Sequence, residues 1–86
     1  MLGEIEKLQI GEKYPRIKLL ILEKLSKSKY RVTDGDKEGF LTFEASNLVV
    51  AKKIEVHGTY LFKALRKGTI LLLYFIFLSY IVNFGR

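Results

Sequence analysis

The chain has 86 residues, 49% of them hydrophobic, and contains no cysteine. This length suits a single domain whose one core is just large enough to hold it together. The absence of cysteine excludes a disulfide framework, thiolate zinc sites and cysteine catalysis. The formal net charge is +6 and the pI is about 9.7. This excess of positive charge favours polyanionic partners, such as nucleic acid or acidic lipid.

The beginning of the sequence does not read as a secretion signal. Residues 1–11 include Glu4, Glu6 and Lys7 and have no apolar stretch of the required length. Residues 1–12 are mildly acidic, and the basic surplus lies between Lys13 and Lys67. We therefore expect a cytoplasmic protein.

Residues 1–14 are expected to form a lead-in that packs against the rest of the domain. Leu2, Ile5 and Leu8 recur at a spacing that predicts one or two helical turns. Gly11 and Pro15 then exclude a long helix.

The next run, Pro15–Ser26, predicts the first β-strand, which closes at Leu22–Lys24. Ile17, Leu19 and Ile21 alternate with Arg16 and Lys18, so the two sets should face opposite sides of a sheet. Further strands are predicted at Lys29–Thr33, Phe40–Ala45, Thr59–Ala64 and from Thr69 onward.

A polar loop joins the second and third predicted strands. Residues 34–39 read Asp-Gly-Asp-Lys-Glu-Gly between two β-type runs, Tyr30–Thr33 and Phe40–Glu44. Short Asp/Gly-rich loops between such runs are typical of hairpins. In the third strand, Leu41, Phe43 and Ala45 should share one face and Phe40, Thr42 and Glu44 the other.

The connection after the third strand predicts a short helix within Ala45–Lys53, with Ser46 or Asn47 as its N-cap. Arg66-Lys67-Gly68 predicts the turn before the last strand. The run Ile70–Val82 is apolar without alternation, longer than an ordinary strand and too short to span a bilayer. A buried strand that continues into a packed C-terminal element, an oligomer interface and a membrane contact all remain open for it.

Together these elements predict an all-β fold of small α content. The expected architecture is a five-stranded Greek-key barrel of the OB-fold type, with a short helix between strands 3 and 4. The whole chain, 1–86, would be one domain: lead-in 1–14, barrel 15–75 and an apolar C-terminal extension 76–86.

Five motifs occur in the order seen in one known family, over roughly residues 5–74. They are Ile5-x-x-Leu8 before Gly11, Ile17-x-Leu19-x-Ile21-Leu22-Glu23, Asp36-x-x-Gly39-x-Leu41-x-Phe43, Ile54-x-x-x-Gly58-x-Tyr60-Leu61, and Lys67-Gly68 before Ile70-x-Leu72. The sequence thereby resembles the archaeal single-stranded DNA-binding proteins of the replication protein A type. The resemblance implies an OB-fold that binds single strands. Ser46 stands where that family often has Trp, and its acidic, Gly-rich tail is replaced by an apolar block.

Binding a single strand requires cations along the backbone path and flat faces for the bases. Phe40 is the best candidate for stacking, with Arg31 as its neighbouring cation. Tyr60 and Phe62 share a strand face and are either core residues or a second stacking platform. The full set expected to bind nucleic acid is Arg16, Lys18, Lys29, Arg31, Phe40, Thr42, Tyr60, Phe62, Lys63, Arg66 and Lys67.

Signals of catalysis and of metal binding are weak. The sequence has no Gly-rich phosphate loop, no HExxH motif and no plausible Ser/His/Asp set. Asp34, Asp36 and Glu38 lack the extended ligand pattern of an EF-hand, so turn chemistry explains them better. His57 is the only histidine and is expected in a turn. We therefore expect a protein that is not an enzyme and needs no metal or other cofactor.

Two function hypotheses remain open. The first is a module that binds single-stranded DNA or RNA through the strand 2–3 face. The second is a structural or interaction protein whose apolar C-terminus mediates homo-oligomerisation or docking on a larger complex. A third hypothesis is a membrane anchor, with Leu71–Val82 in the bilayer and Arg66 and Lys67 at its cytoplasmic edge, but the length of the run argues against a membrane partner.

Overall fold

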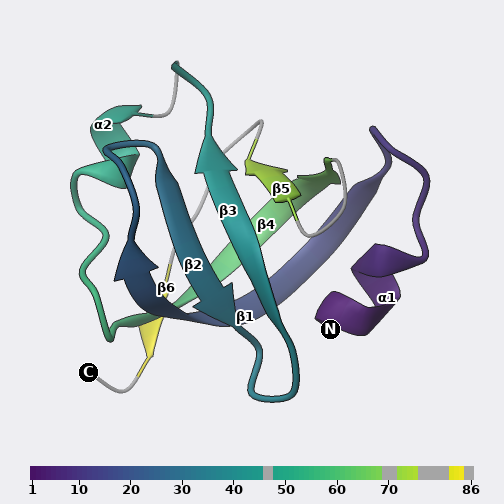
Figure 1. The fold of residues 1–86 in the computed structure, drawn as a ribbon, viewed down its shortest axis with the longest axis horizontal. Helices are drawn as coiled ribbons and strands as arrows, with labels where there is room; N and C mark the ends of the chain where they lie inside the picture. The colour runs from purple at the N-terminus through teal and green to yellow at the C-terminus, as the bar shows by residue number, and fades with distance from the viewer. Residues whose placement is uncertain (46–47, 69–71, 76–81, 85–86) are drawn as a thin grey trace.

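The computed structural model describes residues 1–45, 48–68, 72–75 and 82–84, and the fold is mostly β (Figure 1). Two short helices accompany the strands, α1 at Leu2–Glu6 and α2 at Leu48–Ala51. The strands are β1 (Lys13–Lys24), β2 (Lys29–Thr33), β3 (Glu38–Phe43), β4 (Thr59–Lys67), β5 (Leu72–Phe75) and β6 (Val82–Phe84).

All six strands described belong to one curled, barrel-like sheet, in the order β1-β2-β3-β5-β4-β6. β1 also pairs with β4, so the pairings run in a ring through β2, β3, β5 and β4 back to β1. All pairs are antiparallel except β3 with β5, which are parallel. The expected fifth strand is described from Leu72, whereas 69–71 lie outside the described residues. The segment expected as an extension contributes β6.

The predicted alternation of β1 is confirmed. Ile17, Leu19 and Ile21 are buried, whereas Arg16 and Lys18 are exposed. Side chains from β2, β3 and β4, from both helices and from the connection after α2 complete the core: Leu2, Ile5, Tyr30, Val32, Leu41, Phe43, Ala51, Ile54, Tyr60, Phe62 and Leu65. The third strand spans Glu38–Phe43 rather than Phe40–Ala45, so Ala45 lies beyond it and is exposed.

The alternation of β4 changes phase at Ala64. Tyr60 and Phe62 are buried, as is Leu65 three residues after Phe62. Ala64 has a positive φ of 60°, an unusual value for a residue with a Cβ. This backbone step reverses the alternation, which directs Leu65 into the core and leaves Arg66 half-buried.

Lys67 corrects a sequence-based expectation. It was expected in an exposed turn, but it is the last residue of β4 and only 8% exposed. Its Nζ donates a hydrogen bond of 3.2 Å to the backbone oxygen of Glu6 at the end of α1. Its own backbone is tied to the lead-in by hydrogen bonds with Gly11 and Glu12. Lys67 therefore anchors the lead-in to the sheet and is withdrawn from solvent.

The loop between β2 and β3 is a tight polar turn built around Asp34. One carboxylate oxygen of Asp34 accepts hydrogen bonds from the backbone N–H groups of Asp36 (2.8 Å) and Lys37 (2.9 Å). The other accepts the N–H of Leu2 at 2.8 Å, and Lys37 pairs with Glu6 at 2.8 Å. The turn therefore supports itself and also holds α1 in place. This role confirms that turn chemistry explains Asp34.

The corner between α2 and β4 is formed by His57 and Gly58. His57 has a positive φ of 74°, as a turn residue can have, and its N–H donates to the oxygen of Ile21 at 2.8 Å. Gly58 accepts the N–H of Ile21 at 2.9 Å. The space where a Gly58 Cβ would stand is filled by the Tyr60 ring, 2.8 Å away. Tyr60 in turn accepts the N–H of Glu55 at 2.9 Å.

The predicted helix before β4 is present as α2, at Leu48–Ala51. Its expected N-cap residues, Ser46 and Asn47, lie outside the described residues. Tyr30 of β2 donates a hydrogen bond from its phenol to the oxygen of Ala51 at 3.0 Å, which fixes α2 against the sheet. In the part of the chain that the structure describes, no helix is long and apolar enough to cross a membrane.

Replacing Gly58 with Ala is expected to lower the free energy of unfolding. The new methyl group would overlap the buried Tyr60 ring, and such overpacking costs about 1–3 kcal/mol. Gly3→Ala is the matched control, because its Cβ would meet only the Lys37 side chain, at 3.9 Å. In helix α1 that change should raise stability by up to about 1 kcal/mol. Urea denaturation of both variants measures the difference, and an unchanged midpoint for Gly58→Ala would contradict the packing described.

Replacing Asp34 with Ala should lower stability by about 1–2 kcal/mol at neutral pH, as the loss of a capping carboxylate does. Partial burial raises the pKa of Asp34, but the N–H groups of Lys37, Leu2 and Asp36 outweigh this and set its pKa below the ordinary value. The carboxylate's contribution is therefore complete above the unfolded-state pKa of about 3.9 and is lost as the pH falls through the folded-state pKa.

Thermal denaturation between pH 2 and 7 tests this dependence. The gap between wild type and Asp34→Ala should be constant near neutrality and shrink below about pH 4. Asp36→Ala serves as the control, since Asp36 is exposed and takes part in the turn through its backbone N–H. An equal loss from both variants would remove the special role of Asp34.

Candidate nucleic-acid interface

The outer face of the β2–β3 hairpin carries four of the predicted site residues. The register places Lys29 opposite Thr42 and Arg31 opposite Phe40. All four side chains are half-buried, while their neighbours Tyr30, Val32 and Leu41 are fully buried in the core. The expected outward placement of Phe40 and Arg31 is therefore confirmed.

Phe40 presents an aromatic ring beside a cation. The ammonium of Lys29 lies 5.0 Å from the centre of the Phe40 ring, within the range of a cation–π interaction. Such a contact contributes about 0.5–1 kcal/mol at exposed sites and about 2 kcal/mol when desolvated, and a stacked base, worth about 1–3 kcal/mol, can compete with it. Ring and ammonium together match the two parts of a nucleotide, a flat base and a charged phosphate.

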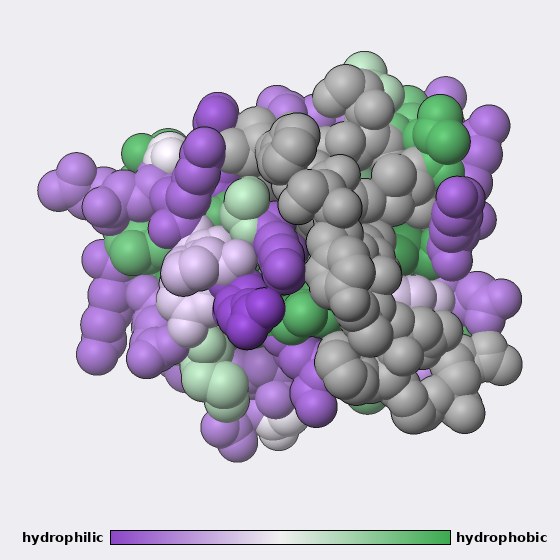
Figure 2. All heavy atoms as spheres, turned by 180° about the vertical axis from the view of Figure 1, so that it is seen from behind, coloured by the Kyte–Doolittle hydropathy of each residue, from purple (hydrophilic) through white to green (hydrophobic). Residues whose placement is uncertain are grey.

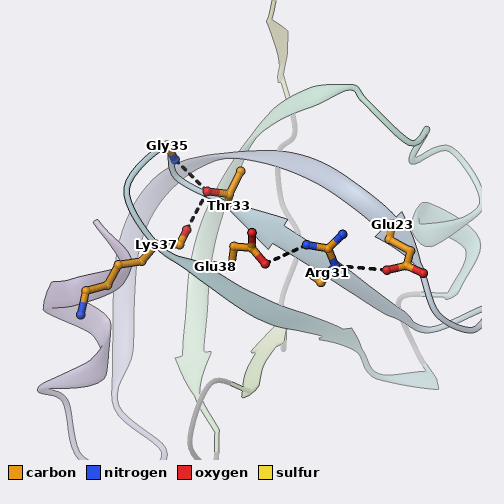
Figure 3. Close-up of polar contacts among 6 residues, drawn as sticks. All are labelled: Glu23, Arg31, Thr33, Gly35, Lys37 and Glu38. Carbon is orange, nitrogen blue, oxygen red and sulfur yellow. Dashed lines mark hydrogen bonds and ion pairs between the residues drawn. The ribbon is translucent and has the colours of Figure 1, made fainter.

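Arg31 is held between two glutamates (Figure 3). Its Nε donates to Glu23 of β1 at 3.1 Å, and its Nη1 donates to Glu38 of β3 at 2.7 Å. The hydrogen bonds to Glu38 and then to Glu23 raise the pKa of Arg31, which is charged in any case. Both acidic partners are exposed, so the pairs add little stability. They do neutralise the cation, and a phosphate at Arg31 would have to compete with two carboxylates.

Sequence reasoning missed Glu23 and Glu38 as partners of Arg31. Glu23 is in register with Arg31 across β1 and β2, and Glu38 is the first residue of β3 on the other side of β2. The sequence shows that opposite charges lie close together in this hairpin. It does not show the irregular register of β1 between Ile21 and Glu23, and this register decides which side chain lies beside Arg31.

The structure decides between the two interpretations of Tyr60 and Phe62. Their exposed fractions are 5% and 0%, and Phe62 lies edge-on to Phe43 with ring centres 6.4 Å apart. Buried rings offer no face to a base from outside. The prediction of a second stacking platform is therefore wrong, and both residues belong to the core.

The remaining predicted cations lie on another part of the barrel. Arg16 and Lys18 of β1 face outward beside β4, where Arg16 is opposite Lys63 and Lys18 opposite Leu61. Arg66 pairs across with Lys13. These residues do not share the β2–β3 face with Phe40, so the predicted set divides between two surfaces. Lys67, buried against α1, belongs to neither.

Thr42 and Arg66 each carry a buried polar atom. Thr42 Oγ1 and Arg66 Nε have no hydrogen-bond partner in the part of the chain that the structure describes. Their backbones lie in one row across the sheet, because Thr42 pairs with Tyr74 of β5 and Tyr74 with Arg66. A hollow of about 270 Å³ lies at this end of the barrel and is lined by Ile10, Gly11, Glu44, Arg66 and Lys67.

Among residues 1–45, 48–68, 72–75 and 82–84, no group of three His, Cys, Asp or Glu side chains could hold a metal ion. Comparisons with protein-family models, with curated proteins and with solved structures find no match for this chain.

Proposed function

We propose that this protein is a non-enzymatic module of the OB-fold type that binds single-stranded nucleic acid, DNA or RNA, through the outer face of β2 and β3. The observation that carries the proposal is the Phe40 ring on that face, with the Lys29 ammonium 5.0 Å from its centre. Stacking on aromatic rings and contact of phosphates with cations are the two interactions by which single strands are bound without sequence readout.

The order of the strand pairings supports the fold assignment. The ring β1-β2-β3-β5-β4-β1, with a parallel β3–β5 pair and a helix between β3 and β4, is the arrangement expected of an OB barrel. In that fold the face of strands 2 and 3 and the adjoining loops bind oligonucleotides. Phe40, Lys29 and Thr42 lie on β2 and β3 of this protein, which supports the proposal.

Charge supports the choice of ligand. A formal net charge of +6 attracts polyanions over distances of about a Debye length, roughly 10 Å at 0.1 M salt. Affinity that depends on phosphates falls steeply as salt is added. A titration of fluorescent oligo-dT and oligo-U at two salt concentrations, with duplex of equal length beside them, tests the proposal as a whole. Absence of binding at low salt would overturn it.

Phe40→Leu is expected to weaken binding of single strands by about 5- to 150-fold, because a stacked base is worth about 1–3 kcal/mol. Leu keeps an apolar side chain at the half-buried position but has no flat face. Phe40→Tyr is the matched control, since it keeps the ring and should bind within about threefold of wild type. Fluorescence anisotropy with oligo-dT measures both.

Equal affinities for wild type, Phe40→Leu and Phe40→Tyr would show that the ring does not stack on a base. The fold is monitored in parallel by thermal denaturation, so that a loss of binding through unfolding is recognised. The salt dependence should be almost the same in all three proteins, because Phe40 contacts no phosphate.

Glu38→Gln is expected to tighten binding. The change keeps the shape of the side chain, removes a negative charge from the β2–β3 face and releases Arg31 from its 2.7 Å partner. One additional phosphate contact raises the salt slope, −∂log K/∂log[salt], by about 0.7 for a single strand. Glu55→Gln, an exposed acid in the loop before β4, controls for net charge. Equal gains from both variants would mean that only the overall charge matters.

A further inference from the structure

The outer face of the β1–β4 pair carries five cations. Lys13, Arg16 and Lys18 lie on β1, and Lys63 and Arg66 lie on β4. The register places Lys13 opposite Arg66 and Arg16 opposite Lys63, so like charges meet directly across the strands. We call these five residues the β1–β4 cation ladder.

The phase change of β4 brings the cations onto one face. In a regular strand, Lys63 and Arg66 would point to opposite sides, because they are three residues apart. The positive φ of Ala64 reverses the alternation between them, and Pro15 stands at the matching place on β1, between the Lys13–Arg66 and Arg16–Lys63 pairs. A backbone conformation unusual for Ala therefore places Lys63 and Arg66 on the same side of β4.

The charges of the ladder differ from those of the β2–β3 face. Neither paired segment, Lys13–Leu20 nor Thr59–Arg66, contains a carboxylate in its sequence, and Glu44 of the connection after β3 lines the same hollow as Arg66. On the β2–β3 face, Arg31 has two glutamates. Like charges directly opposite each other in an antiparallel pair are unfavourable, so we expect the Lys13–Arg66 and Arg16–Lys63 pairs to lower the stability of the free protein.

We infer that the β1–β4 cation ladder is a second binding surface, which holds the phosphate backbone of a further segment of the same single strand bound at β2–β3. The inference rests on the proposed function and extends it. Bases stack at Phe40, while the ladder, which has no aromatic side chain among its five members, contacts phosphates alone. Long strands therefore bind more tightly than short ones, with a steeper dependence on salt.

The two surfaces lie within reach of one strand. One row of paired residues runs from Lys29 through Thr42, Tyr74 and Arg66 to Lys13. Neighbouring strands are about 4.8 Å apart, so Thr42 and Arg66 are separated by two steps of roughly 10 Å in total. Figure 2 shows the rear of the molecule, where hydrophilic residues gather over the half that holds α1 and the start of β1 in Figure 1.

The test compares oligo-dT of about 5 and about 16 nucleotides, lengths that bracket the known site sizes of OB barrels. Arg16→Glu removes one rung of the ladder and places an opposite charge beside Lys63. We expect affinity for the long strand to fall at least about fivefold at 0.1 M salt, with the salt slope lower by about 0.7 or more. Affinity for the short strand should stay within about twofold of wild type.

Lys53→Glu is the matched control, because it makes the same charge change at an exposed lysine beyond α2. It should leave the preference for long strands intact. Arg16→Glu is also expected to raise the melting temperature of the free protein, since it replaces a like-charged pair with an opposite pair. A loss of binding together with a gain in stability cannot be explained by misfolding.

Three results would overturn the inference. The first is that wild-type protein binds both lengths with equal affinity. The second is that Arg16→Glu and Lys53→Glu have equal effects. The third is that the ladder acts only on duplex. These failures differ from failure of the proposed function, which appears as indifference of the short strand to Phe40→Leu. The first would leave a binding face at β2–β3 with a site limited to a few nucleotides.

Discussion

The structure depends on one strand that is paired along both edges. The first half of β1 pairs with β4 and its second half with β2, and Leu20 is in register with both Thr33 and Thr59. Because β1 is shared in this way, the sheet curls back to its own first strand around a buried core. The buried side chains of Ile17, Leu19 and Ile21 fill that core from the shared strand. Any change that shifts β1 would therefore disturb both halves of the sheet.

The shared strand also separates the surface into regions of different chemistry. Toward β2 its outer residues lead to Arg31, Glu23 and Glu38, where positive and negative charges are balanced. Toward β4 they lead to cations without carboxylates in either paired segment. The face proposed for base stacking and the face proposed for phosphate contact thus lie on different parts of the barrel-like sheet. The lead-in is tied to the sheet and to the β2–β3 turn by hydrogen bonds with Lys67, Asp34 and Lys37.

The sequence was informative wherever local periodicity decided the structure. Alternation in Ile17–Ile21 predicted the inner face of β1, and the Asp34–Gly39 loop predicted the hairpin. The phase of β4 could not be predicted, because it depends on the positive φ of Ala64, and Ala has no preference for that conformation. Extrapolating simple alternation from Tyr60 would have placed Leu65 outside. Pairing of Val82–Phe84 with β4 is likewise a long-range contact without a local signal.

The parallel β3–β5 pair and the β1–β4 pair have a consequence for how the chain folds. Lys13 meets Arg66 only when residues from opposite ends of the sequence come together. Contacts of this kind are formed at a high cost in chain entropy, and proteins rich in them fold slowly. The repulsion between the like-charged strands acts in that same closing step. Salt or a polyanion that screens this repulsion should therefore speed the pairing of β1 with β4. It should have less effect on the β2–β3 hairpin, because that hairpin joins neighbouring residues of one charge-balanced segment.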